Sequence, residues 1–277
     1  MNERHLYISD MDGTLLGTDS LVSPRSASIL SELSRRGVLF TVATARTPAT
    51  VEPLLAGVES TVPAIVMTGA ALWDRVTQSY IEPHFIDDRE IERILHACQR
   101  HGITPLIYTL TADDKTIDVY CPGALDAGQQ QFVDERSSFR LKRFHLNTPL
   151  PTESRARVVL IYILGAMAEV EKLAAEIDQD CNCSISVYAD IFDYTRGNLE
   201  IFAPGVSKAA GINRLIEITG ATGTTVFGDN MNDLSMMAVS DRAIAVDNAV
   251  DAVKRAADMV IGPNTADSVA NFIASEN

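Results

Sequence analysis

The sequence predicts an α/β fold with a Rossmann-like parallel-sheet core and an inserted α+β cap domain. Short apolar runs alternate with helical patterns over the first 80 residues, and the same alternation returns near residue 205. The long stretch between these two parts follows a different pattern. Continuous apolar runs are typical of parallel strands that helices cover on both faces. The alternation therefore indicates one parallel sheet whose two halves are separated in the sequence.

The first half of the core is expected to contain three strands and two helices. The strands are predicted at 6–9, 38–43 and 64–67. A helix begins after Ser23, because serine is a good N-cap and Pro24 suits the first helical position, and it ends near Gly37. A shorter helix is predicted around 48–56. The order strand–helix–strand–helix–strand implies an open parallel sheet.

The second half continues the same pattern after the insertion. A helix at about 207–218 precedes a strand at 224–227, and a short helix follows Asp233. Further elements are a strand at 243–246, a helix at 249–256 and a last strand at 259–261. We therefore expect a discontinuous core of residues 1–82 and 201–277 and a cap of residues 83–200.

The insertion is expected to contain a helix–strand–strand unit twice. Asp87 can cap a first helix that ends at Gly102, and two strand-like runs follow at 103–110 and 116–121. A second helix at about 167–179 is followed by runs at 184–189 and 199–203, and a further strand at 157–163 lies between the copies. These elements are the basis for the α+β cap.

Composition limits the partners of the chain. The formal net charge of −14 argues against a nucleic-acid surface, because phosphate backbones require clustered lysine and arginine. No apolar run approaches the roughly 20 residues that a membrane-spanning helix needs, and the N-terminus lacks a signal-peptide pattern. We therefore expect a cytoplasmic protein without membrane or nucleic-acid partners, as a monomer or a weak homo-oligomer. The four cysteines are expected to be reduced thiols.

Polar residues follow the predicted strands where ligands bind to open α/β sheets. Asp10 and Asp12 follow the first strand, with Gly13 as a turn residue, and Thr44 begins Thr44-Ala45-Arg46 after the second. The other candidates are Thr68-Gly69 after the third strand, Gly228-Asp229-Asn230-Met231-Asn232-Asp233 after the strand at 224–227, and Lys208 in the first turn of the preceding helix. Each alone could be a cap or a solvated side chain, but together they place several carboxylates, a hydroxyl and an ammonium in one crevice.

These residue types indicate phosphate chemistry with a metal ion. A ligand set rich in oxygen and without histidine suits Mg²⁺ better than zinc. A carboxylate can attack a phosphate and form an acyl phosphate. The repulsion between the two anions must then be offset, and Mg²⁺, Lys208 and the Thr44 hydroxyl can supply the positive field.

In this order, Asp10-Met11-Asp12-Gly13-Thr14, Thr44, Lys208 and the stretch from Gly228 to Asp233 resemble the four motifs of the haloacid dehalogenase (HAD) superfamily. The insertion resembles the cap of its Cof-type sugar-phosphatase branch. The resemblance implies that Asp10 is the nucleophile and that Asp12 protonates the leaving oxygen and later activates water. It also implies that Thr44 and Lys208 hold the phosphoryl group.

The resemblance assigns further roles around this centre. Mg²⁺ would be bound by the side chains of Asp10 and Asp229 and by the backbone carbonyl of Asp12. Asp233 would not bind the metal itself but would orient Lys208 or a metal-bound water. Substrate contacts are expected from Gly13, Thr44, Arg46, Thr68, Gly69, Lys208 and Asn232. Relatives usually carry Asn-Gly-Ala where this chain has Thr68-Gly69-Ala70, which leaves the substrate open. Asp193, Tyr194 and Arg196 are candidates either for substrate contacts or for ordinary turn positions.

The predicted function is hydrolysis of a small phosphorylated metabolite, with a sugar phosphate as the first candidate, by a Mg²⁺-dependent phosphatase that forms an aspartyl-phosphate. A phosphomutase of the same fold is an alternative. So is a receiver or regulatory phosphate-binding protein. A receiver, however, carries its phospho-acceptor after the third strand, where this chain has Met67-Thr68.

Overall fold

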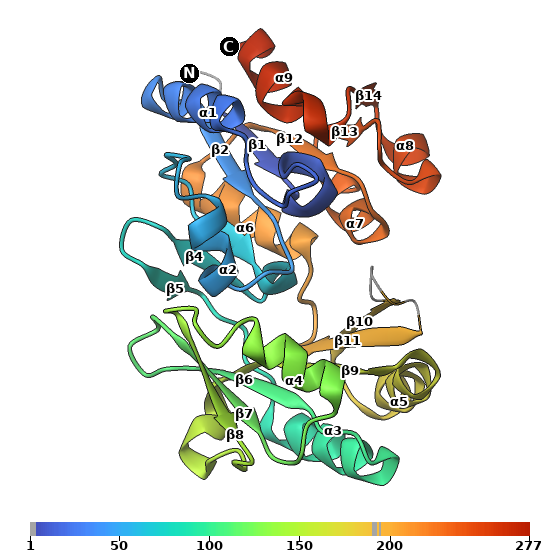
Figure 1. Cartoon of the computed structure of the whole chain (residues 1–277). Helices are drawn as coiled ribbons and strands as arrows, with labels where there is room; N and C mark the ends of the chain where they lie inside the picture. Colours follow the sequence, from blue (N-terminus) through green and yellow to red (C-terminus); the bar gives the residue numbers. More distant parts are fainter. Residues whose placement is uncertain (1–3, 190–192, 194) are drawn as a thin grey trace. The chain divides into compact units, whose positions relative to one another are not determined.

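The structure, a computed structural model, describes residues 4–189, 193 and 195–277 (Figure 1). Its internal contacts divide the chain into two compact units. The core unit contains the residues up to Ile81 together with Ser207–Asn277, and the cap unit is Glu82–Val206. The core unit has a parallel sheet with helices and the cap unit has a separate mixed sheet, which confirms the predicted fold class. The last cap strand runs to Phe202, so the predicted change of domain at 200/201 falls inside a strand.

The core sheet has five parallel strands in the order β14-β13-β12-β1-β2. Their bounds are β1 His5–Ser9, β2 Leu39–Val42, β12 Gly223–Gly228, β13 Arg242–Val246 and β14 Met259–Ile261. Ser9 at the end of β1 pairs with Val42 of β2 on one side and with Phe227 of β12 on the other. The carboxyl ends of these three strands are therefore level, and the residues that follow them lie along one sheet edge.

The core helices begin and end largely where the sequence predicts. Their bounds are α1 Pro24–Arg35, α2 Pro48–Leu54, α6 Lys208–Thr219, α7 Leu234–Met237, α8 Asp251–Ala256 and α9 Ser268–Glu276, with short turns η1 Met11–Leu15, η2 Met67–Gly69, η4 Met231–Asp233 and η5 Asn264–Ala266. The Ser23 hydroxyl accepts a hydrogen bond from Ser26 N, as expected of an N-cap. Gly37 follows α1 with a φ of 90°, a conformation that glycine adopts without strain. Helix α9 was not predicted.

The third strand pairs differently from the prediction. β3 (Ala64–Val66) forms an antiparallel sheet with β4 (Ala71–Asp74) and β5 (Ser79–Ile81), and its pairing with the parallel sheet is the isolated bridge Ala43↔Ile65. The reason is the turn that follows β3: Met67, Thr68 and Gly69 have φ values of 48°, 57° and 95°. Three successive left-handed residues reverse the chain, so β4 returns along β3 instead of leading into a crossover helix.

The cap unit contains a six-stranded sheet with the order β10-β11-β9-β6-β7-β8. Its elements are α3 Asp88–His101, β6 Leu106–Leu110, β7 Ile117–Cys121, α4 Ala127–Asp134, β8 Lys142–Leu146, η3 Thr152–Arg157, β9 Val158–Ala166, α5 Met167–Asp180, β10 Ser184–Ala189 and β11 Arg196–Phe202. The two predicted helix–strand–strand units are present as α3-β6-β7 and α5-β10-β11, and their strand pairs flank β9. Helices α3 and α5 bury apolar side chains against one cluster with β6, β9 and β11. None of the helices described in either unit is long and apolar enough to cross a membrane.

Lys142 in β8 is a buried lysine. Its side chain is 5% exposed, and its ammonium lies 5.1 Å from the centre of the Tyr108 ring and 5.9 Å from that of Phe144. Within residues 4–189, 193 and 195–277, no carboxylate pairs with this ammonium. Burial lowers the pKa of Lys142 to about 7, and the charge of Arg136 acts in the same direction.

This shift predicts that Lys142→Met stabilises the protein in a pH-dependent way. Below pH 7 both states carry the proton and the folded state bears the cost of burying it. Between about pH 7 and 10 the folded state sheds a proton that the unfolded chain keeps, so stability rises with pH. We expect Lys142→Met to gain about 1–3 kcal/mol at pH 7 and less at pH 10, by urea unfolding. Lys172→Met, at a mostly exposed lysine paired with Glu169, is the control; the same gain for Lys142→Met at both pH values would contradict the prediction.

Candidate active site

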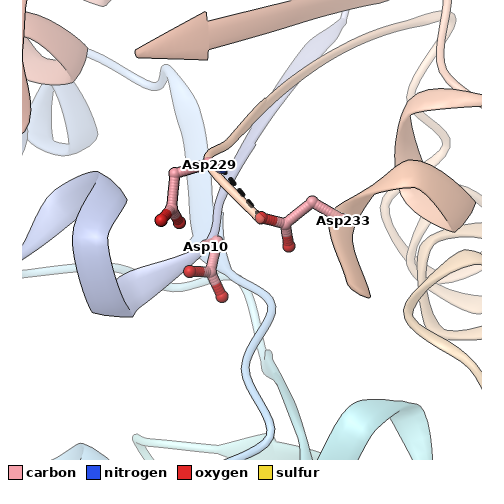
Figure 2. A group of neighbouring side chains, drawn as sticks. All are labelled: Asp10, Asp229 and Asp233. Atoms are coloured by element: carbon pink, nitrogen blue, oxygen red, sulfur yellow. Dashed lines mark hydrogen bonds between the residues drawn. The ribbon is translucent and has the colours of Figure 1, made fainter. Parts of the chain in front are cut away.

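Three carboxylates converge at the carboxyl ends of β1 and β12 (Figure 2). Asp10 directly follows β1, Asp229 follows β12, and Asp233 lies in η4. One oxygen from each carboxylate lies within 4.8 Å of the others. Asp10 and Asp233 are buried, and Asp229 is partly exposed. The level strand ends thus bring together side chains that are more than 200 residues apart in the sequence.

Lys208 lies between two of these carboxylates. It is the first residue of α6 and is fully buried, and its Nζ donates to Asp10 Oδ1 at 2.5 Å and to Asp233 Oδ1 at 2.7 Å. A cation is unfavourable at a helix N-terminus, so the two carboxylates must offset both this and the burial. Burial lowers the pKa of Lys208, but the carboxylates outweigh it and the pKa is raised, so the lysine remains charged.

Asp10 and Asp229 are difficult to ionise together. Burial raises the pKa of Asp10, with Asp233 and Asp229 adding to the effect and Lys208 opposing it. Burial also raises the pKa of Asp229 to about 6, against the hydrogen bond from Thr14. Three carboxylates facing one ammonium leave a deficit of positive charge. A hard divalent cation such as Mg²⁺ fits this all-oxygen site, and Asp10 and Asp229 are the residues that could hold it.

The oxygens of Asp233 are occupied by protein donors. Oδ1 accepts from Lys208, while Oδ2 accepts from the backbone N–H groups of Asp229, at 2.9 Å, and Asn230, at 3.0 Å. The dashed line in Figure 2 marks the first of these backbone bonds. Asp233 therefore fixes both Lys208 and the loop that carries Asp229.

Gly13 and Thr14 shape the surroundings of Asp229. The Thr14 hydroxyl donates to Asp229 Oδ1 at 2.8 Å. A Cβ on Gly13 would lie 2.4 Å from Asp229 Oδ2, so a glycine is required there, and its φ of 76° also favours glycine. Asn248 Nδ2 donates to the Gly13 carbonyl at 2.7 Å and holds this turn. Sequence reasoning missed the roles of Thr14 and Asn248, although Thr14 stands in the first motif.

Thr44 is buried, and its hydrogen bonds connect it to its own loop, to β3 and to the turn after β3. Its Oγ1 accepts from Arg46 N at 3.1 Å, its N–H donates to the Ile65 carbonyl, and its carbonyl accepts from Thr68 N. Because the Thr44 hydroxyl is the acceptor in its contact with Arg46 N, it can still donate its own proton to a ligand. These bonds fix the loops after β2 and β3 to each other.

Asp12 and Arg46 form an ion pair. Arg46 Nε donates to Asp12 Oδ2 and Nη2 donates to Oδ1, both at 2.7 Å. The Asp12 carboxylate is thus turned toward Arg46 and is not part of the group formed by Asp10, Asp229 and Asp233. The sequence predicted Arg46 as a substrate contact and did not predict this pair.

The remaining predicted residues belong to both units. A Cβ on Gly69 would come within 2.1 Å of the Ser207 carbonyl, so Gly69 lets its loop approach the start of α6. Asn232 is exposed in η4, and its carbonyl accepts from the Ser235 hydroxyl. In the cap unit, Arg196 pairs with Asp126, and Tyr194 lies outside the described residues.

Relatives of known sequence cover nearly the whole chain. A pyridoxal phosphate phosphatase of Escherichia coli, YbhA, is 26% identical over 274 residues, which span 96% of this chain and 96% of that protein. A 5-amino-6-(5-phospho-D-ribitylamino)uracil phosphatase of Bacillus subtilis, YcsE, is 23% identical over 97% of this chain and 94% of its own.

Solved structures share the fold over the same length. A haloacid dehalogenase-like hydrolase from Bacteroides thetaiotaomicron has a TM-score of 0.79 at 20% identity and covers 99% of this chain and 100% of its own. A HAD subclass IIB sugar phosphatase has a TM-score of 0.72 at 20% identity, over 98% of both chains. The sequence model of the haloacid dehalogenase-like hydrolases matches residues 7–273. This chain therefore belongs to the haloacid dehalogenase-like hydrolase family.

Proposed function

We propose that this protein is a Mg²⁺-dependent phosphatase that hydrolyses a small phosphorylated metabolite through an aspartyl-phosphate at Asp10. The observation that carries the proposal is the buried contact of Lys208 with Asp10 and Asp233 beside Asp229. A buried carboxylate held by a lysine at a sheet edge is an activated and oriented nucleophile. The phosphatase names of the relatives support the same activity.

The chain's own residues would perform two half-reactions. Asp10 Oδ2 attacks phosphorus while its Oδ1 is held by Lys208, and the bond from phosphorus to the ester oxygen breaks. Asp12 gives its proton to that leaving oxygen and then accepts a proton from the water that attacks the phosphoaspartate. This second step frees Asp10 and releases inorganic phosphate. Lys208 and the Thr44 hydroxyl stabilise the charge on the transferring group.

A divalent cation held by Asp10 and Asp229, with the Asp12 carbonyl as a further ligand, would supply the positive charge that lets a carboxylate approach a phosphate dianion. We expect chelation by EDTA to abolish phosphate release and MgCl₂ to restore it. Mg²⁺ should also raise Tm, since a ligand at 100 times its Kd stabilises the folded state by about 2.7 kcal/mol. Asp229→Asn should weaken the Mg²⁺ response of Tm. Full turnover in EDTA would contradict the metal dependence.

The substrate class is best settled by a phosphate-release screen ranked by kcat/KM. The resemblance of the cap to that of the sugar-phosphatase branch favours a sugar phosphate, whereas the relatives are named for pyridoxal phosphate and for a phosphoribitylaminouracil. All three classes belong in the screen. A phosphomutase would instead convert a sugar phosphate into its isomer without net release of phosphate.

A further inference from the structure

The two-point contact between Arg46 and Asp12 is a polar contact near the site that the proposed chemistry does not use. The guanidinium presents Nε and Nη2 in parallel to the two carboxylate oxygens, at 2.7 Å each. Such paired contacts fix the plane and the direction of a carboxylate as well as its position. A lysine or a single hydrogen bond would leave the carboxylate free to rotate.

Arg46 is itself held in place by its backbone. Its N–H donates to the Thr44 hydroxyl at 3.1 Å, and its carbonyl accepts from Met67 N at 3.0 Å. The loop after β2 is thereby fixed to the turn after β3. The guanidinium therefore extends from an anchored backbone, with a side chain that is 30% exposed.

Asp12, in contrast, has little else to orient its side chain. It lies in the turn after β1, is followed by Gly13 with its φ of 76°, and its side chain is 51% exposed. The hydrogen bonds of the Asp12 carboxylate in the described residues are the two from Arg46. In the proposed mechanism, the Asp12 carboxyl group gives a proton to the leaving oxygen and later takes one from the attacking water. Both transfers require that the carboxyl group points in a defined direction.

We propose that Arg46 is a positioning residue that acts through Asp12, by fixing the direction of its carboxylate, and is not a ligand of the substrate phosphate. The inference rests on the proposed function, because that function gives Asp12 the proton transfers. It differs from the substrate contact that the sequence predicted for Arg46. It also differs from an ordinary surface ion pair, which contributes little to the stability of the folded protein.

Arg46→Ala and Arg46→Lys separate these roles with p-nitrophenyl phosphate as substrate and inorganic phosphate as inhibitor. A positioning role predicts that Arg46→Ala lowers kcat by about 10- to 100-fold, because only part of the contribution of acid–base catalysis is lost. KM and the phosphate Ki should change by less than about 3-fold, because binding of the phosphate does not depend on Arg46. Arg46→Lys should recover only part of the loss, because an ammonium makes a single-point contact. Added guanidinium ion should partly rescue Arg46→Ala.

Leaving-group dependence gives a second readout. The leaving oxygen of an alkyl phosphate depends more on protonation than that of p-nitrophenyl phosphate. Arg46→Ala should therefore lower kcat more with the alkyl ester than with p-nitrophenyl phosphate. The matched control is Arg35→Ala, which removes another arginine–carboxylate contact of the core unit, with Glu59 at 3.0 Å, and should leave kcat and KM unchanged.

A double-mutant cycle with Asp12→Asn decides whether Arg46 acts through Asp12. If it does, Arg46→Ala costs less than about 2-fold once Asp12 has been replaced. Additive losses would overturn the proposal. So would a rise of KM and phosphate Ki of 10-fold or more at constant kcat, or no effect of Arg46→Ala at all. These results would leave the phosphatase mechanism standing, whereas unchanged activity of Asp10→Asn would overturn that mechanism and this inference with it.

Discussion

Replacing Asp10 with asparagine should reduce kcat by about 10⁴-fold or more, which is the scale seen when a covalent nucleophile is removed from an enzyme. The change keeps the size of the side chain and an oxygen that can accept from Lys208. What it removes is the carboxylate that attacks phosphorus. The loss should therefore appear in kcat, while Tm should change by little, because Lys208 keeps its contact with Asp233.

The control for this variant is a carboxylate of the same unit that lies outside the site. Glu32 in α1 has a side chain that is 60% exposed and is 2.7 Å from Arg35, so Glu32→Gln should leave kcat unchanged. The wild-type protein, quenched in acid during turnover, should carry a phosphoryl group on the peptide that contains Asp10. Turnover by Asp10→Asn at the wild-type rate would contradict the covalent mechanism.

The convergence of Asp10 and Asp229 could be predicted because parallel strands impose a simple geometry. A residue that directly follows a parallel strand must lie at the same sheet edge as the residues that follow its neighbours. This is why Asp10 and Asp229 could be placed together from motifs alone. Lys208 joins them from the start of α6, where it contacts Asp10 and Asp233. The helix boundaries were predictable for a similar reason, as at Ser23, where a local cap fixes the start.

Side-chain partners across loops could not be predicted in the same way. Arg46 and Asp12 are 34 residues apart on two loops whose backbone paths depend on the turn after β3. That turn has left-handed Thr68, a β-branched residue that rarely adopts a positive φ, so local preference pointed away from it. The same turn explains why β3 pairs antiparallel with β4. The apolar pattern of β3 alone predicted a strand of the parallel sheet.

Replacing Lys208 with methionine should cost both activity and stability. Lys208 is fully buried between Asp10 and Asp233, so its loss leaves two carboxylates close together without their common partner. Breaking a buried ion pair by removal of one partner costs about 3–5 kcal/mol. We expect a loss of that size in urea unfolding in EDTA, and a kcat lowered by at least about 10³-fold. Lys254→Met, at a partly exposed lysine of the same unit, is the control and should change neither.

A second replacement separates the two losses. Asp233→Asn in the Lys208→Met background removes one of the unpaired charges but keeps an oxygen that can accept from the N–H groups of Asp229 and Asn230. Stability should therefore recover in part, because the penalty came from buried charge and not from packing. Activity should not recover, because Asp10 still lacks the ammonium that orients it and offsets the phosphate charge. Recovery of both together would mean that Lys208 serves the fold alone. Equal stability of Lys208→Met and wild type would contradict the expected cost of leaving these carboxylates unpaired.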